Sequence, residues 1–143
     1  MRPSATPCVS FSVARSAATI LQDILESAEA IASYTRQGKG AFDSNAMLRD
    51  AVVARLIQIG QAVKDAQSAG LNLSAHKPGI PWRSVAGMRD RLTHRYWAIE
   101  TSIVWAAVES DLPKLAQAVR ELLAKQASPR RRKPRKKVRA ASK

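Results

Sequence analysis

The sequence predicts an all-α fold, an up-and-down bundle of four to five helices. Apolar residues recur at the three- and four-residue spacing of amphipathic helices, and no segment alternates with the two-residue period of a strand. Only 6 Gly and 7 Pro interrupt the 143 residues, and hydrophobic residues make up 45% of them. This length and composition suit one domain with a single core.

The first two helices follow from their apolar stripes. One is expected over about residues 16–36, where Gly38 and Gly40 should end it, and the second should begin at a cap formed by Asp43 or Ser44 and run to about residue 68. The stripes consist of Ile20, Leu21, Ile24, Leu25, Ala28, Ile31 and Ala32 in the first helix and of Met47, Leu48, Ala51, Val52, Leu56, Ile59, Ala62 and Val63 in the second.

Two further helical stretches are expected after a loop at residues 71–79. Pro81 can begin the next helix, because proline is tolerated in a first turn, and this helix should end near residues 94–95. The last stretch covers about residues 101–124. The sequence Asp111-Leu112-Pro113 should kink or restart it, because Pro113 cannot donate the interior helical hydrogen bond.

Both ends of the chain differ from this helical domain, which we place at residues 15–127. Residues 1–14 lack periodicity and only faintly resemble a signal peptide, so we expect a disordered extension. Residues 128–143 contain nine Lys and Arg residues and no acid, which is typical of a disordered basic tail. The formal net charge of +13 falls to +4 without these nine charges. The tail therefore offers non-specific attraction to nucleic acid, whereas the helical domain is only mildly cationic.

Metal, disulfide and membrane signals are weak. The single cysteine, Cys8, cannot form an intrachain disulfide and lies outside any CxxC or Cys/His spacing, so we expect no metal or other cofactor and a reducing, cytoplasmic location. No stretch approaches the ~20 apolar residues that a membrane span requires, and we expect no membrane partner.

Reactive side chains are densest in the sequence Arg-Asp-Arg-Leu-Thr-His-Arg-Tyr-Trp at residues 89–97. Only His94 among them titrates near neutrality, so it is the candidate acid or base. Arg89 and Arg91 can bind a phosphate and stabilise the charge that develops during its transfer. An ordinary alternative remains for each: His94 as a surface or capping histidine, and Asp90 as an ion-pair partner that orients Arg89 or Arg91.

Helix geometry separates the two main candidates. Five residues at ~100° each place Arg89 and His94 about 140° apart on a straight helix. Either the helix distorts before His94, or the long arginine wraps round, or the pair converges across a dimer. A two-fold dimer would bring two copies of both residues to one cleft. Arg91 lies closer to the His94 face and is the second candidate for the cation.

The motif and its surroundings closely resemble the HepT branch of the HEPN superfamily. The resemblance extends over roughly residues 15–125. It rests on Arg89-X4-His94-X-Tyr96 and on the segments Ile80-Pro81-Trp82, Gly87-Met88-Arg89, Asp111-Leu112-Pro113 and Leu56-Ile57-Gln58-Ile59-Gly60-Gln61-Ala62.

This resemblance implies a HEPN-like fold and a metal-independent endoribonuclease toxin of a toxin–antitoxin pair. It implies that Arg89 and His94 are the catalytic pair, with Asp90 and Arg91 as supporting residues, in a homodimer whose RNA cleft lies between the subunits. Tyr96 would be the tyrosine that the antitoxin, a minimal nucleotidyltransferase, modifies with AMP. Two alternatives are a catalytically weak or inactive HEPN dimer that binds such a nucleotidyltransferase, and a general nucleic-acid-binding protein that relies on its tail.

Four positions depart from the family pattern. Asp90 stands where asparagine is commonest, Gln61 replaces a usual glutamate, and Arg95 replaces a usual glycine and adds charge beside the histidine. Glu100 stands where an aspartate normally begins the last helix, and glutamate is a poorer cap.

Overall fold

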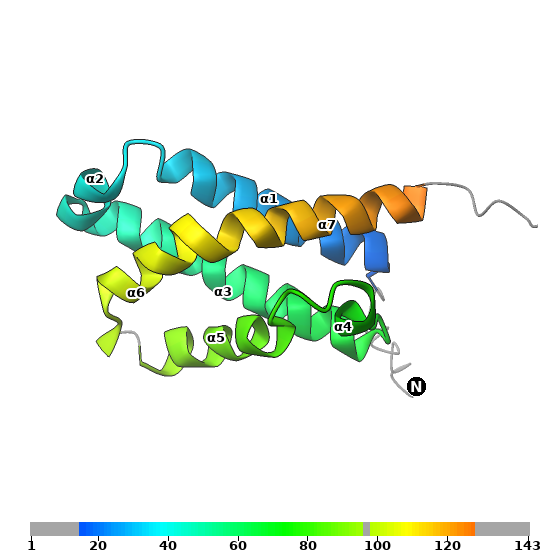
Figure 1. Cartoon of the computed structure of the whole chain (residues 1–143). Coiled ribbons are helices and arrows are strands. Elements are labelled where there is room, and N and C mark those ends of the chain that lie inside the picture. The colour runs from blue at the N-terminus through cyan, green and yellow to red at the C-terminus, as the bar shows by residue number, and fades with distance from the viewer. Residues whose placement is uncertain (1–14, 96–97, 128–143) are drawn as a thin grey trace, which may run out of the picture.

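The computed structural model describes residues 15–95 and 98–127, and this part of the chain is helical without any strand. Helix α1 (Ala17–Tyr34) packs against both α3 (Ala46–Ser68) and α7 (Leu112–Ala127), and α3 packs against α5 (Trp82–His94). Successive long helices run in opposite directions (Figure 1). The predicted all-α, up-and-down bundle is confirmed.

The beginning of the second long helix was predicted wrongly. Residues 39–44 form a short helix of their own, α2 (Lys39–Ser44), which buries Phe42. Helix α3 begins only afterwards, and Asn45, not Asp43 or Ser44, is its cap: the side chain of Asn45 accepts a hydrogen bond from the Leu48 amide at 3.1 Å. Gly38 precedes α2 with φ of +90°, a conformation that glycine adopts without strain.

The predicted loop at residues 71–79 contains one helical turn, α4 (Leu73–His76). Asn72 caps it by accepting from the Ala75 amide at 3.1 Å, and Leu73 is buried. The indole of Trp82 then donates to the carbonyl of Lys77 at 3.0 Å, which fixes the chain where it enters α5. Trp82 itself is a buried core residue.

The last helical stretch is continuous through a π-helical turn. Helix α6 (Thr101–Ala106) continues into this turn, η2 (Ala107–Asp111), and then into α7. The Leu112 amide donates to the Ala107 carbonyl five residues earlier. Such a widened turn relieves the clash that the Pro113 ring would cause in a regular helix, so the expected irregularity is a local bulge. Glu100 makes no side-chain cap at α6, as expected.

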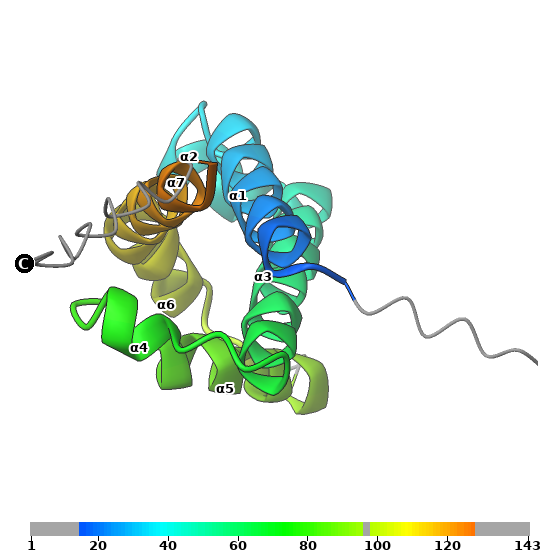
Figure 2. The ribbon, with the colours of Figure 1, turned by 90° about the vertical axis from the view of Figure 1, so that its right-hand side faces the viewer.

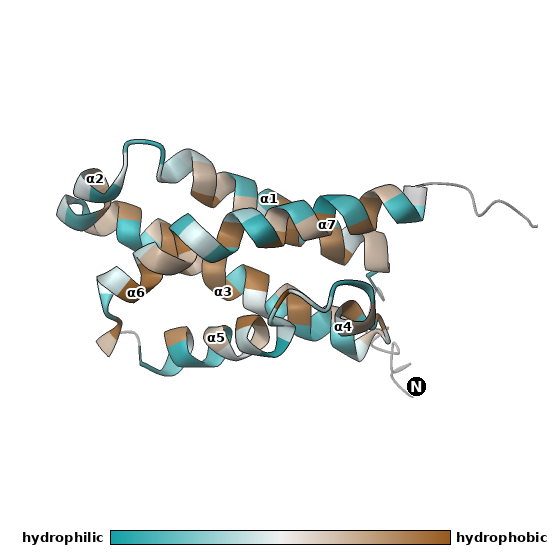
Figure 3. Cartoon of the chain, in the orientation of Figure 1, coloured by the Kyte–Doolittle hydropathy of each residue, from teal (hydrophilic) through white to brown (hydrophobic). Residues whose placement is uncertain are grey.

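The core consists mainly of buried apolar residues of α1, α3 and α7, joined by Trp82, Ala86 and Leu92 of α5. Each of these helices carries apolar stretches along its length (Figure 3). Helix α5 packs mainly on α3, so it stands apart from α6 and α7 when the bundle is viewed along its length (Figure 2). A mostly apolar groove of about 590 Å³ lies between α5 and the α6–η2–α7 arm. No helix in the described ranges is both long and apolar enough to cross a membrane.

Candidate active site

Helix α5 carries the reactive residues from Arg89 to His94 and is a regular α-helix over this stretch. The helix ends at His94, and the Arg95 amide still donates to the Arg91 carbonyl at 3.0 Å. The hydroxyl of Thr93 donates to the Arg89 carbonyl at 2.8 Å within the same turn. The helix therefore does not distort between Arg89 and His94, and the first of the three expected ways to bring them together is wrong.

Arg89 is held by an ion-pair network that reaches across to α3. Its Nη1 donates to Asp90 Oδ1 at 3.0 Å. Lys64 on α3 donates from Nζ to both carboxylate oxygens of Asp90, at 2.9 Å and 2.8 Å. The sequence correctly indicated Asp90 as a partner of Arg89. Lys64 was missed because no local pattern marks it, and only the packing of α3 on α5 brings it to the motif.

The same two cations hold Asp90 in its charged form. The hydrogen bond from Lys64, followed by that from Arg89, lowers the pKa of the Asp90 carboxyl below its usual value. Asp90 is consequently an anion at neutral pH. Lys64, Arg89 and Asp90 together carry one net positive charge.

Gly60 brings α3 and α5 close together at Arg89. A Cβ on Gly60 would lie 2.7 Å from the Cβ of Arg89, 3.1 Å from the Val85 carbonyl oxygen and 3.2 Å from the Arg89 amide nitrogen. The first distance is shorter than real Cβ contacts and the other two are tight, so any side chain at position 60 would force α3 and α5 to shift. Gly87, on α5, has open space where its Cβ would lie.

The remaining charged groups of α5 lie elsewhere. His94 is exposed at the end of the helix, and no contact joins it to Arg89 within the described residues. Arg91 and Arg95, four residues apart, both line the apolar groove. One chain therefore does not bring the two catalytic candidates together. Tyr96, the candidate regulatory residue, lies outside the described residues, as do the predicted N-terminal extension and basic tail.

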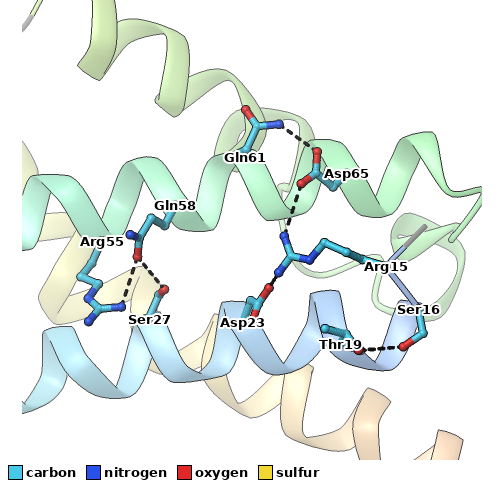
Figure 4. A network of polar contacts seen from close by, with 9 residues as sticks. All are labelled: Arg15, Ser16, Thr19, Asp23, Ser27, Arg55, Gln58, Gln61 and Asp65. Carbon is cyan, nitrogen blue, oxygen red and sulfur yellow. Dashed lines mark hydrogen bonds and ion pairs between the residues drawn. The ribbon is translucent and has the colours of Figure 1, made fainter. Parts of the chain in front are cut away.

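Gln61, a departure from the family pattern, belongs to a different polar network between α1 and α3 (Figure 4). Its amide donates to Asp65 Oδ1 at 2.8 Å. Arg15 pairs with Asp23 and lies 3.9 Å from Asp65, which ties the start of α1 to α3. Gln61 thus supports the packing of these helices through Asp65, and no hydrogen bond joins it to Arg89, Asp90 or Lys64 within the described residues. Within the described ranges, no three His, Cys, Asp or Glu side chains form a group that could hold a metal ion.

The family model described as "Ribonuclease HepT-like" matches residues 24–122. The chain belongs to the HepT-like family of the HEPN superfamily. The matched segment contains the whole of α3 and α5 and therefore every residue of the Lys64–Asp90–Arg89 network. His94 lies within it too.

Named relatives of this HepT-like chain include proteins of two archaeal species. "Putative RNase MJ1380" of Methanocaldococcus jannaschii is 32% identical over 73% of this chain and 94% of its own length. "Probable ribonuclease HepT" of Thermococcus cleftensis is 35% identical over 71% of this chain and 90% of its own length. A longer M. jannaschii protein, "Gamma-glutamylcyclotransferase and putative RNase MJ0434", is 34% identical over 72% of this chain, but the match spans only 46% of that protein. No solved structure has significant similarity to the chain.

Proposed function

We propose that this protein is a metal-independent endoribonuclease, the toxin of a toxin–antitoxin pair, with Arg89 and His94 as its catalytic residues. The observation that carries the proposal is the placing of both residues on one exposed helix, with Arg89 held by Asp90 and His94 open to solvent. Membership of a family whose named members are ribonucleases supports the same activity.

The chemistry requires a base, an acid and a cation. A neutral His94 takes the proton from a ribose 2′-hydroxyl, and the 2′-oxygen then bonds to the adjacent phosphorus. The bond from phosphorus to the 5′-oxygen breaks, and a protonated His94 gives that leaving oxygen a proton. Arg89 stabilises the extra negative charge on the phosphorane. The products are a 2′,3′-cyclic phosphate and a 5′-hydroxyl.

Two subunits supply the two histidine roles. The other histidine of the chain, His76, lies on α4, so a single α5 offers one histidine. A two-fold homodimer joined through α5 brings a second His94 and a second Arg89 to one cleft. The apolar groove beside Arg91 and Arg95, together with the 65% exposed side chain of Ile103 in that groove, supports a partner on this face.

Regulation completes the proposal. A minimal nucleotidyltransferase antitoxin would bind the dimer and transfer AMP to Tyr96, two residues after His94. A bulky phosphate ester at this position would block access of RNA to the histidine. Incubation of the protein with the nucleotidyltransferase and ATP, followed by peptide mass spectrometry, tests the site, and Tyr96→Phe is the control that should remain unmodified.

The decisive experiment measures cleavage of RNA in EDTA. Wild type should cleave, and Arg89→Ala and His94→Ala should each lose about 100-fold or more in rate, because each removes a group that acts in the transition state. Arg83→Ala on the same helix and His76→Ala on α4 are matched controls, both at exposed positions, and should keep wild-type rates. Absence of cleavage by the wild type would support an inactive partner of the nucleotidyltransferase. Binding of RNA that is lost with residues 128–143, without cleavage, would support a tail-driven nucleic-acid-binding protein.

A further inference from the structure

Lys64 lies outside the sequence motif, on a different helix, yet its side chain contacts the motif at Asp90. It is 26 residues from Asp90 in the chain, and its Nζ reaches both oxygens of that carboxylate. The side chain is 34% exposed, so the contact is partly shielded from solvent. A two-pronged contact of this kind fixes the rotation of the carboxylate as well as its position.

Asp90 passes this restraint on to Arg89. Its Oδ1 accepts from Lys64 at 2.9 Å and from Arg89 Nη1 at 3.0 Å, so one oxygen serves both cations. Of the five N–H donors of the guanidinium, this bond uses one, and the others remain available to a phosphate. The direction in which Arg89 presents them therefore depends on where Lys64 holds Asp90.

The packing of α3 on α5 places Lys64 within hydrogen-bond distance of Asp90. Gly60 and Lys64 are four residues apart and so lie on the same face of α3. Gly60 lets the backbone of α5 approach at Arg89, and Lys64 then meets Asp90, the next residue of α5. The close crossing and the ion pair are two parts of one arrangement.

Charge gives Lys64 a second role. Asp90 alone beside Arg89 would cancel the charge of the cation that must attract a phosphate. Lys64 adds a positive charge within hydrogen-bond distance of the same carboxylate, so the network as a whole remains cationic. Loss of Lys64 would leave Arg89 both less firmly placed and electrostatically neutralised.

We propose that Lys64 is a positioning residue for this reaction: through Asp90 it orients Arg89 and preserves its positive charge toward the RNA phosphate. The inference rests on the proposed ribonuclease activity. A neutral side chain at position 90 no longer needs a cation at position 64 to balance its charge. Substitutions at the two positions should therefore compensate each other. Lys64→Gln should be harmful, and Asp90→Asn should correct it.

The test compares full-length wild type with Lys64→Gln, Asp90→Asn and the double variant in single-turnover cleavage of RNA in EDTA. We expect Lys64→Gln to lower the cleavage rate at saturating RNA by about 10- to 100-fold, as misplacement of a catalytic group does, and the double variant to recover to within about threefold of wild type. Lys39→Gln is the matched control, because Lys39 pairs with an aspartate, Asp43, on α2 away from this network. A Lys64→Gln variant with wild-type rate, or a double variant as slow as Lys64→Gln, would overturn the inference.

Two further measurements separate this result from a failure of the proposed function. Thermal unfolding of each variant shows whether it folds, so that a rate is read only from folded protein. A carbon-13 titration of the Asp90 carboxyl reports the contact independently of activity, and Lys64→Gln should raise the pKa of Asp90 because the largest cause of its lowering is removed. An unchanged Asp90 titration would overturn the inference, whereas a wild type that cleaves no RNA would overturn the ribonuclease proposal.

Discussion

Gly60 and Arg89 touch across the α3–α5 crossing: a Cβ on the glycine would lie 2.7 Å from the Cβ of the arginine. Arg89, the candidate catalytic cation, therefore lies where α3 and α5 pack closely together. Its neighbour Asp90 is bound to α3 by Lys64. The close contact with Gly60 fixes the backbone of Arg89, and the ion pair with Asp90 orients its side chain.

Gly60→Ala should disrupt the site through packing alone. The new methyl group would meet a Cβ and backbone atoms, which cannot swing away, so α5 must shift; overpacking of this kind costs about 1–3 kcal/mol of unfolding free energy. Gly87→Ala is the matched control, because it has open space and should stabilise the helix by about 0.5–1 kcal/mol. Urea unfolding and RNA cleavage measure both effects. Equal stability of the two variants would contradict the close approach.

Asp90→Asn should change how stability depends on pH. The folded pKa of Asp90 is below its value in the unfolded chain, about 3.9, so its ion pairs stabilise the fold above that pH and this contribution is lost as pH falls through the folded pKa. The difference in urea midpoint between wild type and Asp90→Asn should therefore be constant from pH 5 to 7 and shrink below about pH 4. If the difference in urea midpoint between the two proteins did not change between pH 6 and pH 2, the ion pairs of Asp90 with Lys64 and Arg89 would be contradicted.

Dimers that join one wild-type chain to one His94→Ala chain should be inactive, because the proposed cleft uses one His94 as the base and the other as the acid. Random exchange between equal amounts of the two chains makes about one quarter of the dimers wild type, one half mixed and one quarter doubly mutant. The activity should therefore fall to about one quarter of that of the same total amount of wild type. Sedimentation velocity checks that both chains dimerise. A fall to only one half would mean that each His94 acts without its partner.

Removal of residues 128–143 should weaken RNA binding without slowing the chemistry. The tail carries nine cations, whose release of counterions makes binding salt-dependent, so the truncated chain should bind more weakly at 50 mM salt and show a shallower slope of log affinity against log salt. The control is a full-length chain with these nine residues replaced by serine. A reduced cleavage rate at saturating RNA in either variant would contradict an auxiliary role for the tail.

Asn45→Ala should test the corrected boundary of α3. Loss of the cap that accepts from the Leu48 amide should cost about 1 kcal/mol of unfolding free energy. Asp43→Ala removes only an exposed ion pair with Lys39 and should cost less than about 0.5 kcal/mol. Thermal unfolding distinguishes the two, and a larger loss at Asp43 would restore the boundary that the sequence suggested.

The sequence predicted what depends on local periodicity. The long helices and the core stripe of α1 follow from i, i+3, i+4 spacing, and α5 begins at Trp82, directly after Pro81, which lies at its N-cap position. Short helices were harder, because α2 and α4 contain too few residues for a periodic signal, and each is fixed by one buried side chain, Phe42 or Leu73. At these places tertiary packing, not propensity, decides the structure.

The sequence predicted which residues of α5 belong to the candidate site, but it did not predict their contacts with α3. Arg89, Asp90 and His94 follow from a motif within one helix, and the pairing of Asp90 with Arg89 was one of the alternatives considered. Lys64 is one surface-type lysine among many in the sequence, and nothing near it signals an ion pair with a residue 26 positions later. The role of Gly60 is equally non-local, since it depends on which backbone crosses α3 at that point.

The one-sided attachment of α5 also bears on how the protein moves. Helices α1 and α3 are each packed against two long neighbours, whereas α5 rests mainly on α3 and borders the groove on its other side. Amide protons of α5 should accordingly exchange with solvent sooner than those of α1 and α3, through a local opening that leaves the rest of the bundle intact. The reactive groups would then belong to the part of the protein that unfolds most readily, and a second subunit lying against α5 would slow this exchange in step with assembly.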